Sequence, residues 1–386
     1  MGGGRPCRPV RVTITEGSPP SPPPHHPSPP NPYPSSQSDY PMIHVMIIDD
    51  SAAIRAQCRG LLEVEQDIEV VAEAADAFAA RRMLDRVSPK VITLDVEMPR
   101  MDGITFLRKL MAGRPTAVVM VSSLTQRGAE ATLEALKLGA VGVVGKPSPD
   151  FPCSLETFAS ALVREVRAAA MARLAGATLV PAAPPLAAVG ADGSLLVAIG
   201  ASTGGTEAIR AVLARMPAAC PPIAIVQHMP PGFTASFARH LDAEMAPHVC
   251  EASDGLALTP GMVAIGAGDT HLEVAGQPGG WRLVVRGGER VNHQRPSVDV
   301  LFHSVARVAG AEAVGVLLTG MGADGAAGMA AMHDAGAYTI AQDEATCTVY
   351  GMPRAAVALG AATVELPLVR IPHAILKATA SRAMAR

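Results

Sequence analysis

Three aspartates in the first half of the chain each follow a strand-like apolar run. Asp49 and Asp50 come directly after the run 43–48, and Asp95 comes directly after the run 91–94. In a doubly wound parallel sheet, functional side chains gather at the C-terminal ends of the strands. With the strand order 2-1-3-4-5 the first and third strands are neighbours, so the three carboxylates converge. Because such a cluster repels itself unless a hard dication neutralises it, the spacing predicts a Mg²⁺ site.

Two further polar side chains make this cluster suitable for a phosphoryl group. Ser122 ends the fourth apolar run with a hydroxyl, and Lys146 ends the fifth with an ammonium group. A carboxylate nucleophile, a metal, a hydroxyl and an ammonium together match what a transferring phosphoryl group requires. A single Asp at a strand end is more often a helix cap, and Asp50-Ser51 is such a pair. Four strand ends that all carry the required residue types favour the joint functional interpretation.

A serine in the second half stands where a nucleophile would be exposed. Gly200-Ala201-Ser202-Thr203-Gly204-Gly205 fits the pattern GxSxG between an apolar run and a predicted helix. Small residues there permit a sharp strand-to-helix turn, and N–H groups at the helix start can face an oxyanion. The chain holds 36 glycines, so the motif alone is a modest signal and its position carries the weight. The register favours Ser202 over Thr203 as the attacking hydroxyl.

A serine hydroxyl needs a base, and two later strand ends supply the partners. His228 follows the run 223–226, and Asp324 lies in a glycine-rich turn after the run 314–318. His228 would take the proton of Ser202, and Asp324 would fix the imidazole tautomer. Taken alone, His228 is more often a partly exposed histidine at a strand end, and Asp324 is equally well explained as a helix cap. Three strand ends of one sheet can meet, however, which favours the joint interpretation. The order Ser…His…Asp differs from the Ser…Asp…His of ordinary α/β-hydrolases, which disfavours a lipase-like fold.

The elements that must position these residues alternate between strands and helices. This alternation predicts an α/β protein with two doubly wound parallel-sheet domains. The runs 262–265 and 283–285 are interpreted as strands of a hairpin-rich insert in the second domain. In the first half we expect strands at 43–48, 68–72, 91–94, 117–121 and 140–144, with helices at 52–64, 76–87, 103–112, 127–138 and 155–173. In the second half we expect strands at 195–199, 223–226, 314–318 and 337–340, with helices at 206–215 and 325–335.

Proline distribution marks the domain boundaries. Residues 1–41 hold 13 of the 34 prolines and are predicted to be a disordered extension, more readily an inert tail than a partner-binding segment. Met42 or Met46 could be the natural start. The first domain is expected at 42–173, and 174–193 reads as a linker that is semi-stiff at its prolines. The second domain is expected at 194–386.

Composition excludes several classes of protein. Apolar types make up 49% of residues, only 3% are aromatic, and 32 basic residues against 35 acidic ones give a net charge of −3. This balance argues against nucleic acid as a partner. No apolar run approaches the length of a membrane span, and no secretory signal is recognisable. The six cysteines form no CxxC pair and no two of the remaining histidines have zincin spacing, so we expect reduced thiols in a cytoplasmic protein and no metal or other cofactor beside Ser202.

The first half resembles the receiver domain of bacterial response regulators. This resemblance implies that Asp95 accepts a phosphoryl group from a histidine kinase. It also implies that Asp49, Asp50 and Asp95, with the Glu97 carbonyl, hold Mg²⁺, while Ser122 and Lys146 bind phosphoryl oxygens. Many receivers have an aromatic residue three positions before the lysine, but this chain has Val143, so signalling by an aromatic flip is not expected. The matching motifs are Ile47-Ile48-Asp49-Asp50-Ser51, Asp95-Val96-Glu97-Met98-Pro99-Arg100-Met101-Asp102-Gly103, Val121-Ser122-Ser123-Leu124-Thr125 and Gly145-Lys146-Pro147.

The second half resembles the catalytic domain of the chemotaxis methylesterase family. The two resemblances together cover residues 43 to about 372 and imply a flavodoxin-like receiver followed by a Rossmann-like serine esterase domain. Ser202, His228 and Asp324 would form the triad, and the Met321 N–H would bind the oxyanion. The matching blocks are Ile199-Gly200-Ala201-Ser202-Thr203-Gly204-Gly205, Gln227-His228-Met229-Pro230, Arg295-Pro296-Ser297-Val298-Asp299, Leu318-Thr319-Gly320-Met321-Gly322 and Ala341-Gln342-Asp343.

The function implied by the resemblance is a phosphorylation-regulated esterase of chemotaxis adaptation. That family hydrolyses glutamate γ-methyl esters on the cytoplasmic helices of chemoreceptors and releases methanol, and some members deamidate receptor glutamines. The expected partners are chemoreceptors and a chemotaxis histidine kinase, without direct insertion into the membrane. We expect the unphosphorylated receiver to pack across the strand ends that carry Ser202. A catalytically silent binding module and an esterase of small metabolites are the alternatives, while a transcriptional role is weakest because a basic recognition helix is lacking.

Overall fold

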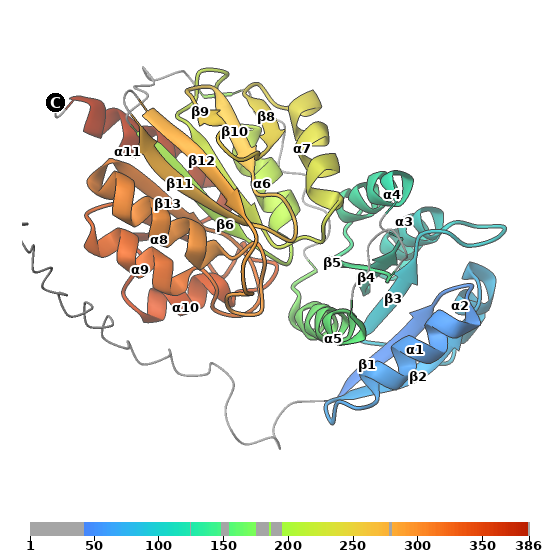
Figure 1. The fold of residues 1–386 in the computed structure, drawn as a ribbon. Coiled ribbons are helices and arrows are strands. Elements are labelled where there is room, and N and C mark those ends of the chain that lie inside the picture. The colour runs from blue at the N-terminus through green and yellow to red at the C-terminus, as the bar shows by residue number, and fades with distance from the viewer. Residues whose placement is uncertain are drawn as a thin grey trace, which may run out of the picture. The chain divides into compact units, whose positions relative to one another are not determined.

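The computed structural model describes residues 42–123, 125–147, 154–174, 185–186, 195–277 and 280–384 (Figure 1). The predicted extension 1–41 and most of the predicted linker 174–193 lie outside the described residues. The described segments belong to one compact unit of the chain. None of the described helices combines the length and the apolar character needed to cross a bilayer.

A five-stranded parallel sheet forms the first domain, with the strand order β2-β1-β3-β4-β5. This order was predicted from the sequence and is confirmed. Helices α1 and α5 pack on one face, while α2, α3 and α4 pack on the other, so the sheet is doubly wound. The strands are β1 (Ile43–Ile48), β2 (Ile68–Ala74), β3 (Val91–Asp95), β4 (Ala117–Ser122) and β5 (Gly142–Gly145). The helices are α1 (Ala52–Leu62), α2 (Ala77–Leu84), α3 (Gly103–Gly113), α4 (Gln126–Lys137) and α5 (Leu155–Met171).

The cap of α1 decides between two interpretations of Asp50. The N-cap of this helix is Ser51, whose Oγ accepts a hydrogen bond from the Ile54 N–H at 3.4 Å. Asp49 Oδ1 accepts from the Ser51 N–H at 2.9 Å, which fixes the turn that leaves β1. The Asp50 side chain is exposed and does not serve as the cap, so capping does not account for its presence.

A seven-stranded sheet forms the second domain, in the order β15-β14-β13-β6-β7-β10-β8, and all its pairs are parallel. Helices α6, α7 and α11 cover one face and α8, α9 and α10 the other (Figure 1). The strands are β6 (Leu196–Ala201), β7 (Ile223–Gln227), β8 (His248–Glu251), β10 (Met262–Ile265), β13 (Ala313–Leu317), β14 (Tyr338–Gln342) and β15 (Val364–Leu366). The helices are α6 (Gly205–Leu213), α7 (Phe233–Glu244), α8 (Val298–Ala309), α9 (Ala326–Asp334), α10 (Met352–Ala358) and α11 (Ile371–Met384). The predicted α/β class with two doubly wound domains is therefore confirmed.

One strand assignment from the sequence is wrong. The run 262–265, interpreted as part of a hairpin-rich insert, is β10 and pairs in parallel with both β7 and β8 in the main sheet. Val263, Ala264 and Ile265 are fully buried, as expected for a parallel strand covered on both faces. The run 283–285 does belong to a hairpin, formed by β11 (His271–Gln277) and β12 (Gly280–Arg286). This hairpin joins β9 (Ala257–Leu258) in a small antiparallel sheet.

The winding of the second sheet reverses at its centre. The chain moves from β6 to β7 in one direction, whereas β13 and β14 lie on the other side of β6. The C-terminal ends of β6, β7 and β13 therefore surround a switch point, where parallel sheets bind ligands.

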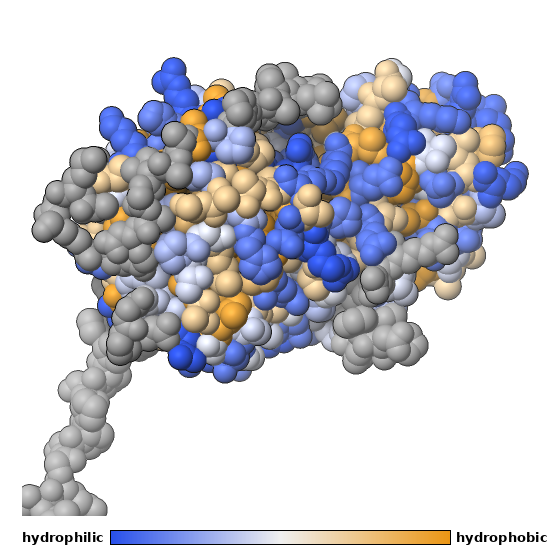
Figure 2. All heavy atoms as spheres, turned by 90° about the horizontal axis from the view of Figure 1, so that it is seen from above, coloured by the Kyte–Doolittle hydropathy of each residue, from blue (hydrophilic) through white to orange (hydrophobic). Residues whose placement is uncertain are grey.

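On the face of the molecule shown in Figure 2, hydrophilic and hydrophobic residues are interspersed.

Candidate active site

Close packing explains the small residues around Ser202, which follows β6 and is 5% exposed. A Cβ on Gly200 would lie 2.2 Å from Val298 Cγ1, and a Cβ on Gly205 would lie 2.2 Å from Gln227 Oε1. Gly204 has a φ of 76°, in the left-handed region that glycine adopts most easily. The turn between β6 and α6 therefore depends on glycine at three positions.

Strand pairing brings Ser202 beside His228. Ala201 in β6 is paired in register with Gln227 in β7, so the next residues leave neighbouring strands together. The His228 N–H donates to the Ala201 carbonyl at 3.1 Å. Gln227 Nε2 donates to the carbonyls of Ser202 at 2.9 Å and His228 at 3.1 Å. The side chain of Gln227 thus connects the turn after β6 with the turn after β7. Gln227 lies within one of the matching sequence blocks, but nothing in the sequence indicates this role.

Asp324 holds the imidazole of His228. Its Oδ2 lies 2.8 Å from His228 Nε2, and the two side chains are only 4% and 3% exposed. Burial by itself would raise the pKa of Asp324, but hydrogen bonds and the charge of His228 outweigh burial and lower it. Further donors to this carboxylate are the N–H groups of Val298 and Asp299, the Ser297 hydroxyl and the Asn292 side-chain amide.

The contact with Asp324 also assigns the two ring nitrogens of His228. Because Asp324 is anionic, Nε2 carries the hydrogen, and Nδ1 is left as the basic nitrogen. Nδ1 is buried and has no hydrogen-bond partner among the described residues. Among the described residues Nδ1 and Ser202 Oγ share no hydrogen bond, so it is the pairing of β6 with β7 that makes His228 and Ser202 neighbours. A ring nitrogen that carries no hydrogen can act as a general base once the hydroxyl comes within reach.

The Met321 turn approaches the serine closely. A Cβ on Gly320 would lie 2.7 Å from Ser202 Cβ, so only glycine allows this approach. Within the described part of the chain, the N–H groups of Met321 and Thr203 donate to no acceptor. The sequence predicts Met321 as an oxyanion donor, and the Thr203 N–H is a further candidate that was not considered there. The rule that the residue after the nucleophile supplies one donor would have found it.

The hydroxyl groups of Ser202 and Thr203 differ in their contacts. Thr203 Oγ1 donates to Glu165 Oε2, a buried carboxylate of α5, at 3.4 Å. Ser202 Oγ forms no hydrogen bond with any described residue. Of these two neighbouring hydroxyls, that of Thr203 is hydrogen-bonded within the described part of the chain and that of Ser202 is not.

A second candidate site lies at the C-terminal edge of the first sheet. Carboxylate oxygens of Asp49, Asp50 and Asp95 lie within 4.8 Å of one another. Lys146 Nζ lies 2.7 Å from Asp49 Oδ2 and 2.9 Å from Asp95 Oδ1. Burial raises the pKa of Asp95 to about 6, an effect that Lys146 opposes and Asp49 reinforces. Three carboxylates that converge in this way fit a hard dication, for which oxygen is the preferred ligand.

Two other predicted residues of this site are placed differently. The Glu97 backbone N–H is hydrogen-bonded to the carboxyl of Asp95. Ser122, at the end of β4, directs its Oγ to the carbonyls of Ser123 at 3.4 Å and Gly128 at 3.5 Å. The structure thus brings Lys146 into contact with Asp49 and Asp95 and places Asp50 close by, whereas the Ser122 hydroxyl is hydrogen-bonded to backbone carbonyls.

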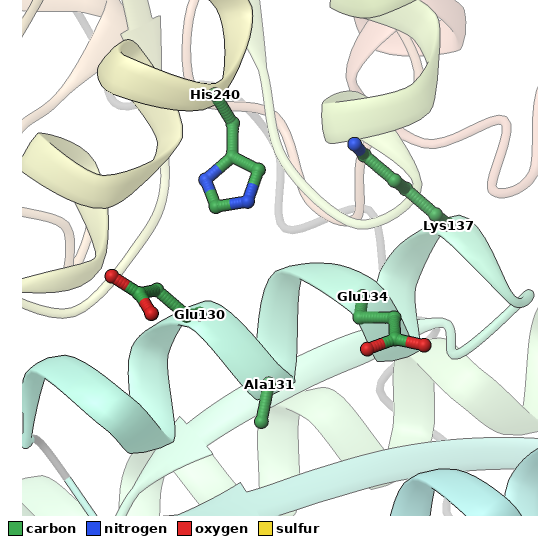
Figure 3. Close-up of a pocket in the computed structure, with 5 residues that line it drawn as sticks. All are labelled: Glu130, Ala131, Glu134, Lys137 and His240. Carbon is green, nitrogen blue, oxygen red and sulfur yellow. The ribbon is translucent and has the colours of Figure 1, made fainter.

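Helices of the first domain also contact the second domain. Besides Glu165, the segment that follows α5 contributes Arg173, whose N–H donates to the Thr348 carbonyl at 2.9 Å and whose side chain pairs with Glu344. Lys137 of α4 pairs with Glu244 of α7. A nearby pocket has a volume of about 400 Å³. Figure 3 shows the residues that line it, which are Glu130, Ala131, Glu134, Lys137 and His240. None of the residues predicted to carry chemistry lines this pocket.

Comparison with known proteins identifies the family of each half of the chain. Residues 197–375 match the family model of the CheB methylesterase, and residues 45–151 match that of the response regulator receiver domain. A protein-glutamate methylesterase/protein-glutamine glutaminase 2 of Pseudomonas aeruginosa is 50% identical over 343 residues, which cover 88% of this chain and 98% of that protein. The chain belongs to the CheB methylesterase family.

A second relative covers most of the chain, and a solved structure covers its second half. A protein-glutamate methylesterase/protein-glutamine glutaminase of Bordetella parapertussis is 51% identical over 337 residues, which cover 86% of this chain and 96% of that protein. The crystal structure of the Thermotoga maritima CheB methylesterase catalytic domain has 38% sequence identity and a TM-score of 0.47, covering 47% of this chain and 97% of that chain. Ser202, His228 and Asp324 all lie within the part that matches the CheB methylesterase model.

Proposed function

We propose that this chain is a protein-glutamate methylesterase whose activity is controlled by its receiver domain. It hydrolyses γ-methyl esters of glutamate on chemoreceptors and thereby serves chemotaxis adaptation, and it deamidates receptor glutamines as the names of its relatives indicate. The observation that carries the proposal is the contact of His228 Nε2 with Asp324 Oδ2 at 2.8 Å. His228 directly follows β7, which pairs with β6, the strand that precedes Ser202.

In the proposed reaction Ser202 Oγ attacks the ester carbonyl. His228 Nδ1 takes the hydroxyl proton, and Asp324 stabilises the imidazolium that results. The tetrahedral intermediate collapses when the bond to the methoxy oxygen breaks, and His228 returns the proton so that methanol leaves. Water then attacks the acyl-enzyme with the help of the same base and releases the glutamate. With a glutamine substrate the leaving group is ammonia.

The N–H groups of Met321 and Thr203 are proposed to bind the oxyanion. Both are free of other acceptors among the described residues and flank the serine from two turns. Preorganised donors of this kind favour the transition state over the ground state because they meet charge that develops only during reaction. Removal of one such donor typically lowers kcat by about 10²–10³.

Control is proposed to start at Asp95, which accepts a phosphoryl group from a histidine kinase. Asp49, Asp50 and Asp95, with the Glu97 carbonyl, would hold Mg²⁺, which neutralises the charge of the carboxylates and the phosphoryl group. Lys146 is proposed to bind a phosphoryl oxygen after exchanging its present ion pairs. The Ser122 hydroxyl would do the same after leaving the carbonyls that it now contacts.

Helix α5 is proposed to transmit this change to the esterase. Glu165 of α5 contacts Thr203, and Arg173, two residues after the end of α5, contacts the loop at Thr348, so this helix reaches the residue beside Ser202. Phosphorylation would shift the population toward an arrangement in which substrate reaches Ser202. We propose 42–173 as the receiver, 174–193 as the linker and 194–386 as the esterase domain. Because its partners act on the cytoplasmic side, the cytoplasm is the proposed location.

The test is methanol release from methylated chemoreceptor, with and without a small-molecule phosphodonor. Ser202→Ala is expected to lose nearly all turnover while Asp95 is still phosphorylated. Asp95→Asn is expected to keep basal turnover and lose stimulation. Wild-type turnover in Ser202→Ala would refute the triad. If the wild-type protein hydrolysed a soluble nitrophenyl ester but released no methanol from the receptor, it would be a small-molecule esterase instead.

A further inference from the structure

A second buried carboxylate lies directly beside Asp324. Asp299 stands in the first turn of α8 and is 7% exposed. Its N–H donates to Asp324 Oδ1 at 3.3 Å, and its own Oδ1 accepts from the Gly328 N–H at 2.6 Å. Burial and the charge of Asp324 both raise the pKa of Asp299. Two carboxylates in such a site destabilise each other unless a donor lies between them.

Asn292 supplies that donor. Its Nδ2 donates to Asp299 Oδ2 at 2.7 Å and to Asp324 Oδ1 at 2.8 Å, so one amide group bridges the two acids. The side-chain amide has two hydrogens, which these two bonds use. The flipped orientation would turn the carbonyl oxygen toward two carboxylates and is therefore excluded electrostatically. No motif considered in the sequence included Asn292.

The backbone around Asn292 is built to hold the amide in place. Val291 and Gln294 exchange backbone hydrogen bonds of 3.1 and 2.9 Å, so Asn292 and His293 form the tip of a tight turn. Both tip residues have positive φ, 52° and 62°, a conformation that Asn tolerates better than most residues. His271 anchors the same loop, since its Nε2 lies 2.7 Å from the Glu289 carbonyl.

We propose that Asn292 is a positioning residue for the esterase triad, which holds Asp324 toward His228 by bridging it to Asp299. This inference rests on the proposed function. Oδ1 of Asp324 is restrained by Asn292, Ser297 and the N–H of Asp299, which leaves Oδ2 directed at the imidazole. Without the bridge, the carboxylate of Asp324 faces that of Asp299 and turns away from His228. The base is then less well oriented, so the chemical step slows while substrate binding is unaffected.

The experiment is a double-mutant cycle on methanol release from methylated receptor. Asn292→Ala is expected to lower kcat by at least about tenfold, as for loss of a hydrogen bond to a charged group, with KM changed less than about twofold. Asp299→Asn is expected to lower kcat because it sets two amide donors face to face. The double variant has neither the repulsion between the carboxylates of Asp299 and Asp324 nor the two opposed amide groups. Its kcat should therefore exceed that of Asn292→Ala several-fold.

His293→Ala is the matched control, because it changes the other positive-φ residue of the same turn and touches no triad residue. It is expected to keep kcat within about twofold of wild type. Equal losses in His293→Ala and Asn292→Ala, or strictly multiplicative losses in the cycle, would overturn the inference in favour of a role in loop folding. If Asn292→Ala fails to fold, Asn292→Ser, which keeps one donor, is measured in its place and must show the same kcat-selective loss.

Ser202→Ala separates this inference from the proposed function. If Ser202→Ala retains turnover, the proposed triad is wrong and the inference falls with it. If Ser202→Ala is inactive while Asn292→Ala keeps wild-type kcat, the proposed function stands and the inference alone fails.

Discussion

Replacement of Gly320 by alanine tests the packing of the serine turn without replacing any residue of the proposed triad. Gly320 has no positive φ, so alanine can adopt its backbone conformation and only space is at issue. The added Cβ would lie 2.3 Å from Met352 Sδ, 2.7 Å from Ser202 Cβ and 3.1 Å from Ser202 N. Met352 is fully buried and cannot swing out to solvent. The serine turn itself must therefore move.

The distance by which Ser202 must move determines how far kcat should fall. Ordinary contact begins at 3.4 Å, so Ser202 Cβ must retreat by about 0.7 Å from its present place. Overpacking of this kind costs about 1–3 kcal/mol of unfolding free energy. Misplacement of a reacting group by 1 Å lowers turnover by about 10², so we expect kcat of Gly320→Ala to fall by about thirtyfold.

The assay is methanol release from methylated receptor, combined with urea unfolding of the same preparations. Gly276→Ala is the matched control, because a Cβ on this exposed strand glycine meets nothing within 4 Å. It should match wild type in both measurements. A Gly320→Ala variant with turnover within twofold of wild type would refute the reasoning, because Ser202 would then tolerate the displacement.

Three further predictions concern the two sites and the contact between their domains. Asp324→Asn sets an NH₂ group against donors that now bind the carboxylate, so methanol release should fall by about 10³–10⁴. The pKa of Asp324 is lower in the folded protein than in the unfolded chain, where it is about 3.9. Ionised Asp324 therefore contributes fully to the free energy of unfolding above that pH, and the contribution is lost as the pH falls through the folded pKa. The urea midpoint should therefore drop more steeply below pH 4 in wild type than in Asp324→Asn, and equal drops would contradict this assignment. Glu165→Ala removes the partner of Thr203 and should raise basal turnover of unphosphorylated protein severalfold; unchanged basal turnover would show that the contact does not restrain the enzyme. Chelation of divalent cations should abolish phosphorylation of Asp95 by acetyl phosphate and leave basal methanol release intact, and phosphorylation that persists would exclude the metal.

Much of the fold could be predicted because parallel sheets have a strong sequence signature. Strands covered on both faces are continuous apolar runs, and those ending at Ile48, Asp95 and Gln227 are recognisable by inspection. The polar residue after each run then marks the edge where a site forms. Strand β10 was misassigned because its four residues carry no sign of their partners, which are set by packing of the whole sheet.

Details that depend on side-chain orientation could not be predicted. Whether Asp324 contacts Nδ1 or Nε2 of His228 depends on how the ring leaves β7, and sequence does not encode it locally. The contact of Glu165 with Thr203 joins residues 38 positions apart on separate domains, and the bridge of Asn292 depends on a loop closing over the triad. Such contacts arise from tertiary packing, so residue types and spacing alone give no signal for them.

The central claim is that Ser202 is a nucleophile activated by His228, which Asp324 holds in place. Mass spectrometry after treatment with phenylmethylsulfonyl fluoride tests it most directly, because the reagent sulfonylates an activated serine without any receptor. We expect a single adduct on Ser202 whose rate of formation falls by about 10² or more in His228→Ala. An adduct on Thr203, or an adduct on Ser202 that forms equally fast in His228→Ala, would contradict it.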